Sequence, residues 1–215
     1  MSPYAPPPGP VPYVHIDEYL IVIDKPAGLL SVPGRGEDKA DCAVARVNAD
    51  YPGALTVHRL DMATSGLLML ARSKDMQAAL SGLFERGAVD KEYLADVWGA
   101  PDPPTGEIDL PLITDWPNRP RQKVDHEIGK PSRTLYETLG PTSTGARLRL
   151  TPLTGRSHQL RVHLAEIGHP ILGDELYAHE AARTGTNRLH LHASRIGFDH
   201  PGTGKRLDLS LPCPF

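Results

Sequence analysis

The chain has only two cysteines, Cys42 and Cys213, and no C-x-x-C pair. Two thiols cannot supply the disulfide framework of a small secreted protein or a four-thiolate zinc site. No stretch reaches the length of about 18 apolar residues needed to cross a bilayer, and the N-terminus lacks a basic and apolar signal segment. These absences favour a reducing, cytoplasmic location and argue against secretion and membrane insertion.

Motifs for nucleotides and metals are also missing. The chain contains neither G-x-x-x-x-G-K-[ST] nor G-x-G-x-x-G, and it lacks the G-x-S-x-G of many serine hydrolases. Ten histidines include His190 and His192 on one face of a predicted strand, with His158 and His163 as further candidates. Because H-E-x-x-H and the zinc deaminase pattern are both absent, we expect no metal and no cofactor.

The net charge of -3 and the pI of about 6.4 argue against a nucleic-acid binder when the chain is taken as a whole. The charge is unevenly distributed, however. Residues 116–165 carry nine Lys or Arg against three acids, a balance of +6, whereas the rest of the chain sums to -9. Two interpretations stay open: a local field that attracts a polyanion, or a solvated face of charged strands.

A chain of 215 residues with 40% hydrophobic residues has the composition of a folded protein of one large domain. Residues 1–12 contain six prolines and are predicted to form a flexible arm, leaving 13–215 as the folded domain. Many strands and few helices, without regular alternation, predict an α+β fold around a mainly antiparallel or mixed sheet. Strands are predicted over 19–24, 66–71, 91–98, 121–125, 133–139, 147–150, 188–198 and 206–211, and helices over 41–50, 73–86 and 156–167.

Two dense polar clusters are candidates for chemistry. In the first, residues 58–66, Asp61 has two interpretations: a nucleophile, general base or metal ligand, or an aspartate that only shapes a turn. In the second, residues 154–163, Arg156 and Arg161 lie at the start of the predicted helix and could bind phosphate or carboxylate. The alternative for this cluster is an ordinary amphipathic helix with a basic outer face.

These clusters, taken with others, resemble the RluA family of pseudouridine synthases over nearly the whole chain. The resemblance begins in IDKPAGLLSVPGR at 23–35 and continues in HRLD at 58–61 with TSG at 64–66, which is like the family's catalytic-aspartate motif. KEYLA at 91–95 is similar to the motif with the active-site tyrosine, and GRSHQLRVH at 155–163 with GHPILGD at 168–174 to the third block. LHA at 191–193, with HP at 200–201, resembles the last block. Four blocks in the right order make the resemblance specific.

The resemblance implies a cofactor-independent isomerase with a single catalytic domain. Asp61 would be the essential carboxylate, Arg161 its cationic partner, and Tyr93 the ring that packs against the base and helps to remove the C5 proton. Arg59 would enter the space left by the flipped base. The motif match leaves open whether Asp61 attacks covalently or removes a sugar proton. The expected RNA-binding residues are Arg59, His58, Thr64, Arg156, His158, Arg119, Arg121 and Lys123.

Within the family, the middle section at 109–131 is most similar to members that modify two RNAs, at the first uridine of a tRNA anticodon loop and in a hairpin loop of large-subunit ribosomal RNA. Many relatives carry an N-terminal S4 domain. Since only 60 residues precede Asp61, we expect none in this protein, and we expect a monomer. The alternatives are a synthase specific for one of the two RNAs, a non-catalytic RNA-binding module and a metal-dependent hydrolase.

Overall fold

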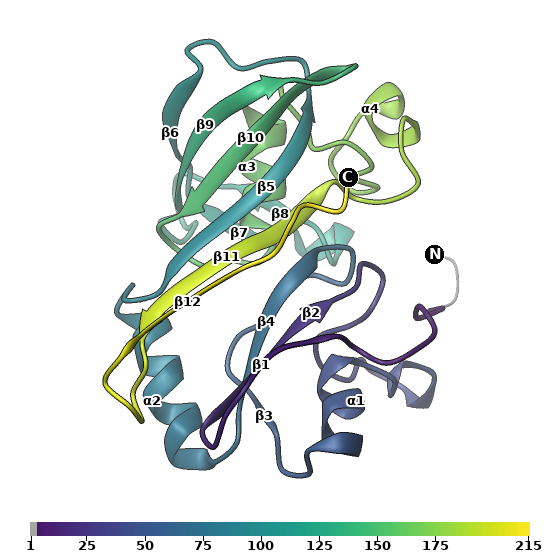
Figure 1. The fold of residues 1–215 in the computed structure, drawn as a ribbon. Coiled ribbons are helices and arrows are strands. Elements are labelled where there is room, and N and C mark those ends of the chain that lie inside the picture. The colour runs from purple at the N-terminus through teal and green to yellow at the C-terminus, as the bar shows by residue number, and fades with distance from the viewer. Residues whose placement is uncertain (1–3) are drawn as a thin grey trace. The chain divides into compact units, whose positions relative to one another are not determined.

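The computed structural model describes residues 4–215, so residues 1–3 of the predicted arm lie outside the described part. The chain forms two compact units (Figure 1). The first comprises the chain up to Asp90 together with Ala193–Pro212, and the second comprises Lys91–His192 together with Cys213–Phe215. Each unit consists of antiparallel strand pairs with a few helices, as the predicted α+β class requires.

The first unit is organised around two buried strands, β2 and β4, which pair antiparallel. Both strands were predicted from their apolar runs in the sequence. Every residue of β4 is buried because both faces of the strand are covered. Leu20, Val22, Leu67 and Met69 pack together in the core with Phe198. The strands of this unit are β1 (Tyr13–Ile16), β2 (Leu20–Lys25), β3 (Leu55–Thr56), β4 (Ser65–Ala71), β12 (Arg206–Ser210) and most of β11 (Leu191–Asp199).

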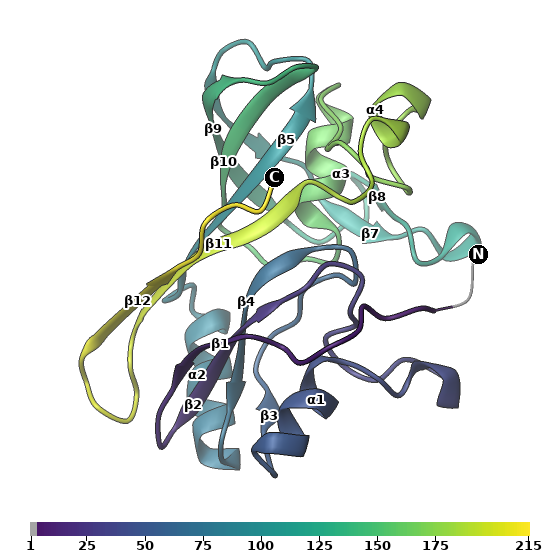
Figure 2. The ribbon, with the colours of Figure 1, turned by 45° about the vertical axis from the view of Figure 1, so that its right-hand side comes forward.

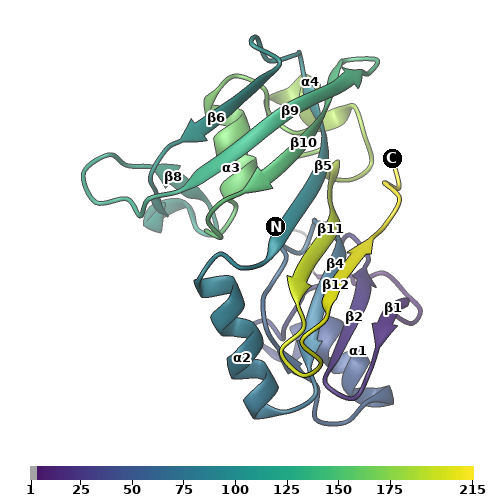
Figure 3. The same ribbon diagram turned by 60° about the vertical axis from the view of Figure 1, so that its left-hand side comes forward.

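Helix α2 (Lys74–Glu85) confirms the prediction of a Ser73 N-cap, because the Ser73 hydroxyl accepts the backbone N–H of Met76. Figure 3 shows α2 alongside the strands of the first unit, where its Met76 and Leu80 enter the core. Helix α1 (Ala43–Asp50) begins two residues after Asp41, the residue at which the sequence predicted its start. Asp41 instead forms an ion pair with Arg46. The 3-10 turn η1 (Glu37–Lys39) precedes α1.

Residues 4–12 form no helix or strand, but they make polar contacts with the first unit. The Tyr4 hydroxyl donates to the carbonyl of Asp41, and the Arg46 guanidinium donates to the carbonyls of Pro7 and Gly9. Val11 is buried. The flexibility of the arm stays a prediction.

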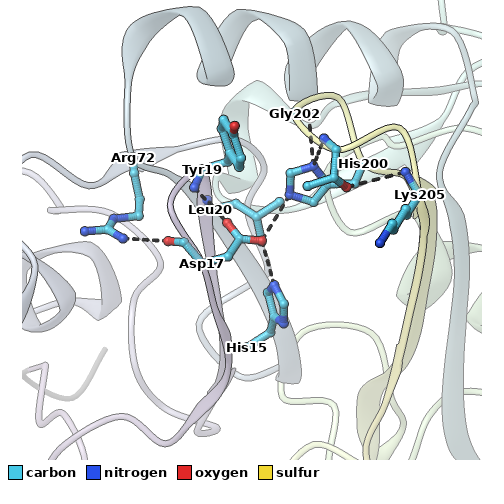
Figure 4. Close-up of polar contacts among 9 residues, drawn as sticks. His15, Asp17, Tyr19, Leu20, Arg72, His200, Gly202 and Lys205 are labelled. Carbon is cyan, nitrogen blue, oxygen red and sulfur yellow. Dashed lines mark hydrogen bonds and ion pairs between the residues drawn. The ribbon is translucent and has the colours of Figure 1, made fainter.

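A polar cluster around Asp17 joins the β1–β2 turn to the β11–β12 turn (Figure 4). The Asp17 carboxylate accepts hydrogen bonds from His15 Nε2 at 2.8 Å and His200 Nε2 at 3.1 Å. His200 Nδ1 accepts the backbone N–H groups of Gly202 and Thr203, so Nε2 carries the ring proton. Burial alone would raise the pKa of Asp17, but these donors, together with the N–H groups of Tyr19 and Leu20, hold it below its usual value. The cluster therefore holds these two turns of the first unit together through hydrogen bonds.

In the second unit, β10 pairs antiparallel with β5 on one side and β9 on the other, and β9 pairs with β6. Strands β6 and β7, the short helix α4 (Glu180–Thr184) and, in the first unit, β1 and β3 were not predicted from the sequence. The strands of the second unit are β5 (Asp90–Trp98), β6 (Thr105–Asp109), β7 (Leu112–Thr114), β8 (Gln122–Val124), β9 (Arg133–Pro141) and β10 (Gly145–Pro152).

Helix α3 (Gln159–Glu166) lies against one face of the sheet of the second unit, with the β7–β8 hairpin beside it (Figure 2). The prediction of a helix from 156 was wrong by one turn. The Gln159 side chain accepts the backbone N–H of Arg156, and His158 takes a left-handed conformation with φ of 54°, so 156–158 form a turn. All residues from Gln159 to Leu164 are buried, and the alternative of an amphipathic helix with a basic outer face is therefore also wrong.

Candidate active site

The residues singled out from the sequence fall into two groups, one in each unit. Asp61, His58, Arg59 and Thr64 belong to the first unit. The second unit holds the predicted catalytic residues Tyr93 and Arg161 and the predicted RNA contacts Arg119, Arg121, Lys123, Arg156 and His158.

Asp61 lies in the loop that leads into the buried strand β4. Its carbonyl accepts the backbone N–H of Thr64 at 3.1 Å, which closes a turn over residues 61–64. The Asp61 side chain is half-buried, whereas Leu60 before it is buried and Met62 after it is exposed. The turn is closed by the backbone carbonyl of Asp61, and the chemical role of its carboxylate stays a prediction.

Both neighbours of Asp61 are held by the segment 25–31. The Ser31 hydroxyl donates to the Leu60 carbonyl at 2.7 Å and accepts the Leu60 N–H at 3.1 Å. On the other side, the Met62 carbonyl accepts the Lys25 ammonium at 3.1 Å and the Gly28 N–H at 2.8 Å. These bonds fix the backbone on each side of the Asp61 carboxylate, as a carboxylate that must meet a reacting atom requires.

Lys25 is completely buried. Its ammonium also donates to the carbonyls of Pro26 at 2.9 Å and Leu29 at 2.7 Å, so each of its three protons has a backbone acceptor. A buried ammonium is tolerated only when it is compensated in this way. Lys25 and Ser31 both lie in the first resembling block, but the sequence alone did not indicate what they bind.

The other predicted residues of the first unit differ in exposure. Arg59 is exposed, whereas Thr64 is buried. His58 stacks on Phe84 with ring centroids 4.6 Å apart, and its Nε2 accepts the N–H of Met69 at 3.0 Å. These contacts give His58 a structural part in holding the loop, while its RNA contact stays a prediction.

Gly66 has φ of 109°, and a Cβ there would overlap the backbone of Ala193, so the position requires glycine.

In the second unit, Tyr93 lies on β5 opposite Leu150 of β10 and is half-buried. Because side chains alternate along a strand, Tyr93 shares a face with the buried Ala95 and Val97. A rigid sheet therefore sets the position of the Tyr93 ring.

Arg161 is buried on α3 and forms a two-point ion pair with Asp174. Its Nε and one terminal nitrogen lie 2.8 Å and 2.7 Å from the two carboxylate oxygens. The Asp174 carboxylate also accepts the N–H groups of Leu176 and Tyr177. Asp174 was missed as a functional residue, although it ends the third resembling block. Pairing of Arg161 with Asp61 stays a prediction.

Tyr177 is a second residue that the sequence did not reveal. Its ring centroid lies 5.2 Å from the Arg161 guanidinium and 5.6 Å from that of Arg121. Its hydroxyl accepts the N–H of Gln122 at 2.7 Å and lies 2.7 Å from His158 Nδ1. Tyr177 therefore connects the β7–β8 hairpin with the start of α3.

The structure divides the nine basic residues of 116–165 into two classes. Some form ion pairs with carboxylates of the second unit: Arg133 with Glu107, Arg147 with Asp96, Arg149 with Glu92 and Glu137, and Arg161 with Asp174. The others are exposed: Arg119, Arg121, Lys123, Lys130 and Arg156. Of these, Lys123 lies 3.7 Å from Asp125. The available positive charge is therefore concentrated around the β7–β8 hairpin.

Two histidines of the predicted motifs are buried. Burial, followed by the charge of Arg188, lowers the pKa of His192 to about 4. Burial also lowers the pKa of His163, whose ring bonds Thr134 and the Leu110 carbonyl. Both rings are therefore neutral near pH 7.

Among residues 4–215, no three His, Cys, Asp or Glu side chains are grouped as a metal site would need. None of the helices in that part of the chain is long and apolar enough to cross a membrane.

Comparisons with known proteins agree on one family. The family described as RNA pseudouridylate synthase matches residues 19–166. The chain is 48% identical to the dual-specificity RNA pseudouridine synthase RluA of Escherichia coli K12, covering all of this chain and 99% of that protein. It is 47% identical to the RluA of Vibrio parahaemolyticus, covering 88% of that protein.

Solved structures give the same result. Human RNA pseudouridylate synthase domain containing 1 is 27% identical, with a TM-score of 0.79 over 97% of this chain and 87% of that chain. Human RNA pseudouridylate synthase domain containing 4 is 26% identical, with a TM-score of 0.76 over 94% of this chain and 88% of that chain. The fold and the sequence motifs therefore lead to the same family.

Proposed function

This chain belongs to the RNA pseudouridylate synthase family and isomerises uridine in RNA, and on that premise we propose that it has two substrates. The first is the tRNA anticodon loop, at its first uridine, and the second is a hairpin loop of large-subunit ribosomal RNA. The support is full-length similarity to relatives that are named dual-specificity synthases. The chain would work in the cytoplasm as a monomer.

The reaction breaks the bond between C1' of the ribose and N1 of the base and forms one between C1' and C5. The proton leaves C5 and N1 gains one, so atoms balance without an oxidant, reductant or cofactor. A carboxylate suits the first step, either by covalent attack or by removing a sugar proton. Asp61 is the carboxylate that we assign to this role, and its loop, held through Leu60 and Met62, is the observation that carries the assignment.

The remaining roles follow from the motif match and the local structure. Arg161, oriented by Asp174, would keep Asp61 ionised, because a neighbouring cation favours carboxylate. Tyr93 would pack against the base and help to remove the C5 proton. Exposed Arg59 would fill the space from which the uridine leaves, which costs least for a loop nucleotide.

RNA would be held by the basic side chains in and beside the β7–β8 hairpin. Arg119, Arg121 and Lys123 occur without an intervening acid, and Arg156 and His158 lie in the turn that precedes α3, the helix beside the hairpin. Basic side chains of this kind neutralise phosphates and release counterions, which makes binding salt-dependent. An acidic protein can bind RNA in this way because its exposed basic side chains are concentrated in one region and create a local positive field there.

The test is to map pseudouridines in RNA from cells with and without the gene, by carbodiimide modification and primer-extension stops. Loss of stops at the anticodon-loop uridine and the ribosomal hairpin uridine, restored by wild type but not by Asp61→Ala, is the expected result. Loss in only one RNA would overturn dual specificity. If no stop changes, both proposed substrates are wrong.

A further inference from the structure

Among the Phe, Trp and Tyr side chains of residues 4–215, Trp116 is the only exposed one. It is 66% exposed and begins the 3-10 turn η2 (Trp116–Asn118) between β7 and β8. The other tryptophan, Trp98, is half-buried and packs edge-on against His179. Exposure of a large apolar ring is unfavourable in water, and tryptophan in particular is enriched where proteins bind partners.

The indole is held by its own turn. Arg119 lies over the ring, with its guanidinium carbon 4.6 Å from the centroid. The turn is closed at its base by hydrogen bonds from the Asp115 N–H to the Arg121 carbonyl and from the Arg121 N–H to the Asn118 carbonyl. Asn118 also donates from its side chain to Asp115. The ring is therefore presented on a stiff support, and little conformational entropy remains to be lost on binding.

The charge around Trp116 indicates what it binds. Arg119 and Arg121 have no carboxylate partner in the described part of the chain, and Lys123 follows two residues later. Unneutralised guanidinium groups beside a flat apolar face complement a nucleotide, whose phosphate is anionic and whose base is planar. A protein partner would be expected to cover more apolar surface than one indole.

We propose that Trp116 and Arg119 form a stacking platform for an unpaired nucleotide of the RNA loop other than the uridine that is modified. The inference rests on the proposed RNA hairpin substrates. Tyr177 bonds the backbone of Gln122 at the end of this turn, so the platform has a fixed place on the second unit. A platform there favours an RNA whose loop has an unpaired base that can stack on the indole, whatever the identity of that base.

The experiment uses the intrinsic fluorescence of the platform. In the full-length Trp98→Phe variant, Trp116 is the only tryptophan, because the chain has two. We expect an anticodon stem-loop RNA to quench its emission and to protect it from iodide. A fully paired duplex of the same stem should do neither. Trp116→Ala should weaken stem-loop binding by about 10-fold or more, and Trp116→Phe much less.

Ile128 provides the matched control, since it is 70% exposed on the same unit but has no π-face. Ile128→Ser should leave RNA affinity within twofold. Equal quenching by duplex and stem-loop, or wild-type affinity in Trp116→Ala, would overturn the platform. Emission that depends on protein concentration without RNA would assign Trp116 to self-association and would overturn it as well.

The outcomes separate the platform from the proposed function. If wild type forms pseudouridine in the stem-loop but the stem-loop does not quench the emission of Trp116, only the platform proposal is wrong. If Trp116 is quenched by the stem-loop but no pseudouridine forms there, the platform stands and the proposed substrate is wrong. At saturating RNA, Trp116→Ala should retain the single-turnover rate, because Trp116 would act in binding.

Discussion

The hydroxyl of Ser31 bonds both backbone polar groups of Leu60, the residue immediately before Asp61. The two residues are 29 positions apart in the sequence, and both are buried. One side chain thus satisfies an N–H and a C=O that would otherwise be unpaired next to the proposed catalytic carboxylate.

Replacement of Ser31 by alanine should reduce both stability and turnover. Leaving the Leu60 groups unpaired should cost about 1–3 kcal/mol of the free energy of unfolding. Displacement of Asp61 should lower kcat by about 10- to 100-fold while the RNA affinity is kept. Urea unfolding and single-turnover kinetics measure the two effects.

The control for Ser31 is Ser73→Ala, which removes the N-cap of α2. This change should cost about 1 kcal/mol without altering kcat, because Ser73 bonds Met76 in the helix and not the loop of Asp61. An equal loss of kcat in both variants would show that activity follows stability alone and would contradict the positioning role of Ser31.

Asp174→Ala should destabilise the protein strongly. The change removes the two-point partner of Arg161, and the side chains of both residues are almost completely buried. Leaving the charge of Arg161 without Asp174 is expected to cost about 3–5 kcal/mol, measured by urea unfolding. Glu107→Ala, which breaks the exposed pair with Arg133, should cost much less, because water screens exposed charges. Similar losses in the two variants would contradict the account.

Stability should fall as the pH is lowered from about 6.5 to about 4. The pKa of His192 is about 4 in the folded protein, below the ordinary value of 6.5, so the unfolded chain takes up the proton first. The contribution is therefore present above pH 6.5 and is lost toward pH 4, with a slope of up to about 1.4 kcal/mol per pH unit.

His192→Asn should flatten this slope in unfolding measurements across that range. His163, whose pKa is also lowered by burial, should supply part of the slope that remains. His126→Asn is the control, because His126 is exposed. An unchanged slope in His192→Asn would show that the ring is not neutral when buried.

RNA affinity should depend on salt through the β7–β8 hairpin. Arg121→Gln should reduce the slope of the logarithm of the binding constant against the logarithm of salt concentration by about 1. Arg133→Gln should leave the slope unchanged, because Arg133 is already paired with Glu107. Equal effects of the two substitutions, measured by filter binding, would place the RNA elsewhere.

Local signals in the sequence predicted much of the fold. Helix α2 followed from the Ser73 cap and the helical spacing of its apolar residues, and the buried strands β2 and β4 followed from their apolar runs. The short strand β6 was missed because its residues pair with residues of β9 that lie 24 to 32 positions further along the chain. The start of α3 was misplaced because the Gln159 side chain, not a helical turn, bonds Arg156.

For the candidate site too, the sequence predicted residues in local motifs but not the contacts between distant segments. Motifs indicated Asp61, Tyr93 and Arg161, but not the residues that hold them. Ser31 and Asp174 act through contacts that form only in the folded chain, 29 and 13 positions away from their partners. Periodicity and spacing describe neighbours along one element, and they carry no information on such tertiary hydrogen bonds.

The role of Asp61 is tested most directly by release of tritium from an RNA stem-loop labelled at C5 of its uridines, with purified wild type and Asp61→Asn. Bond formation at C5 must expel that hydrogen. We expect tritium release by wild type in step with pseudouridine formation, and no release by Asp61→Asn, which should still bind the RNA. Release by Asp61→Asn near the wild-type rate would contradict the assignment of Asp61 as the essential carboxylate.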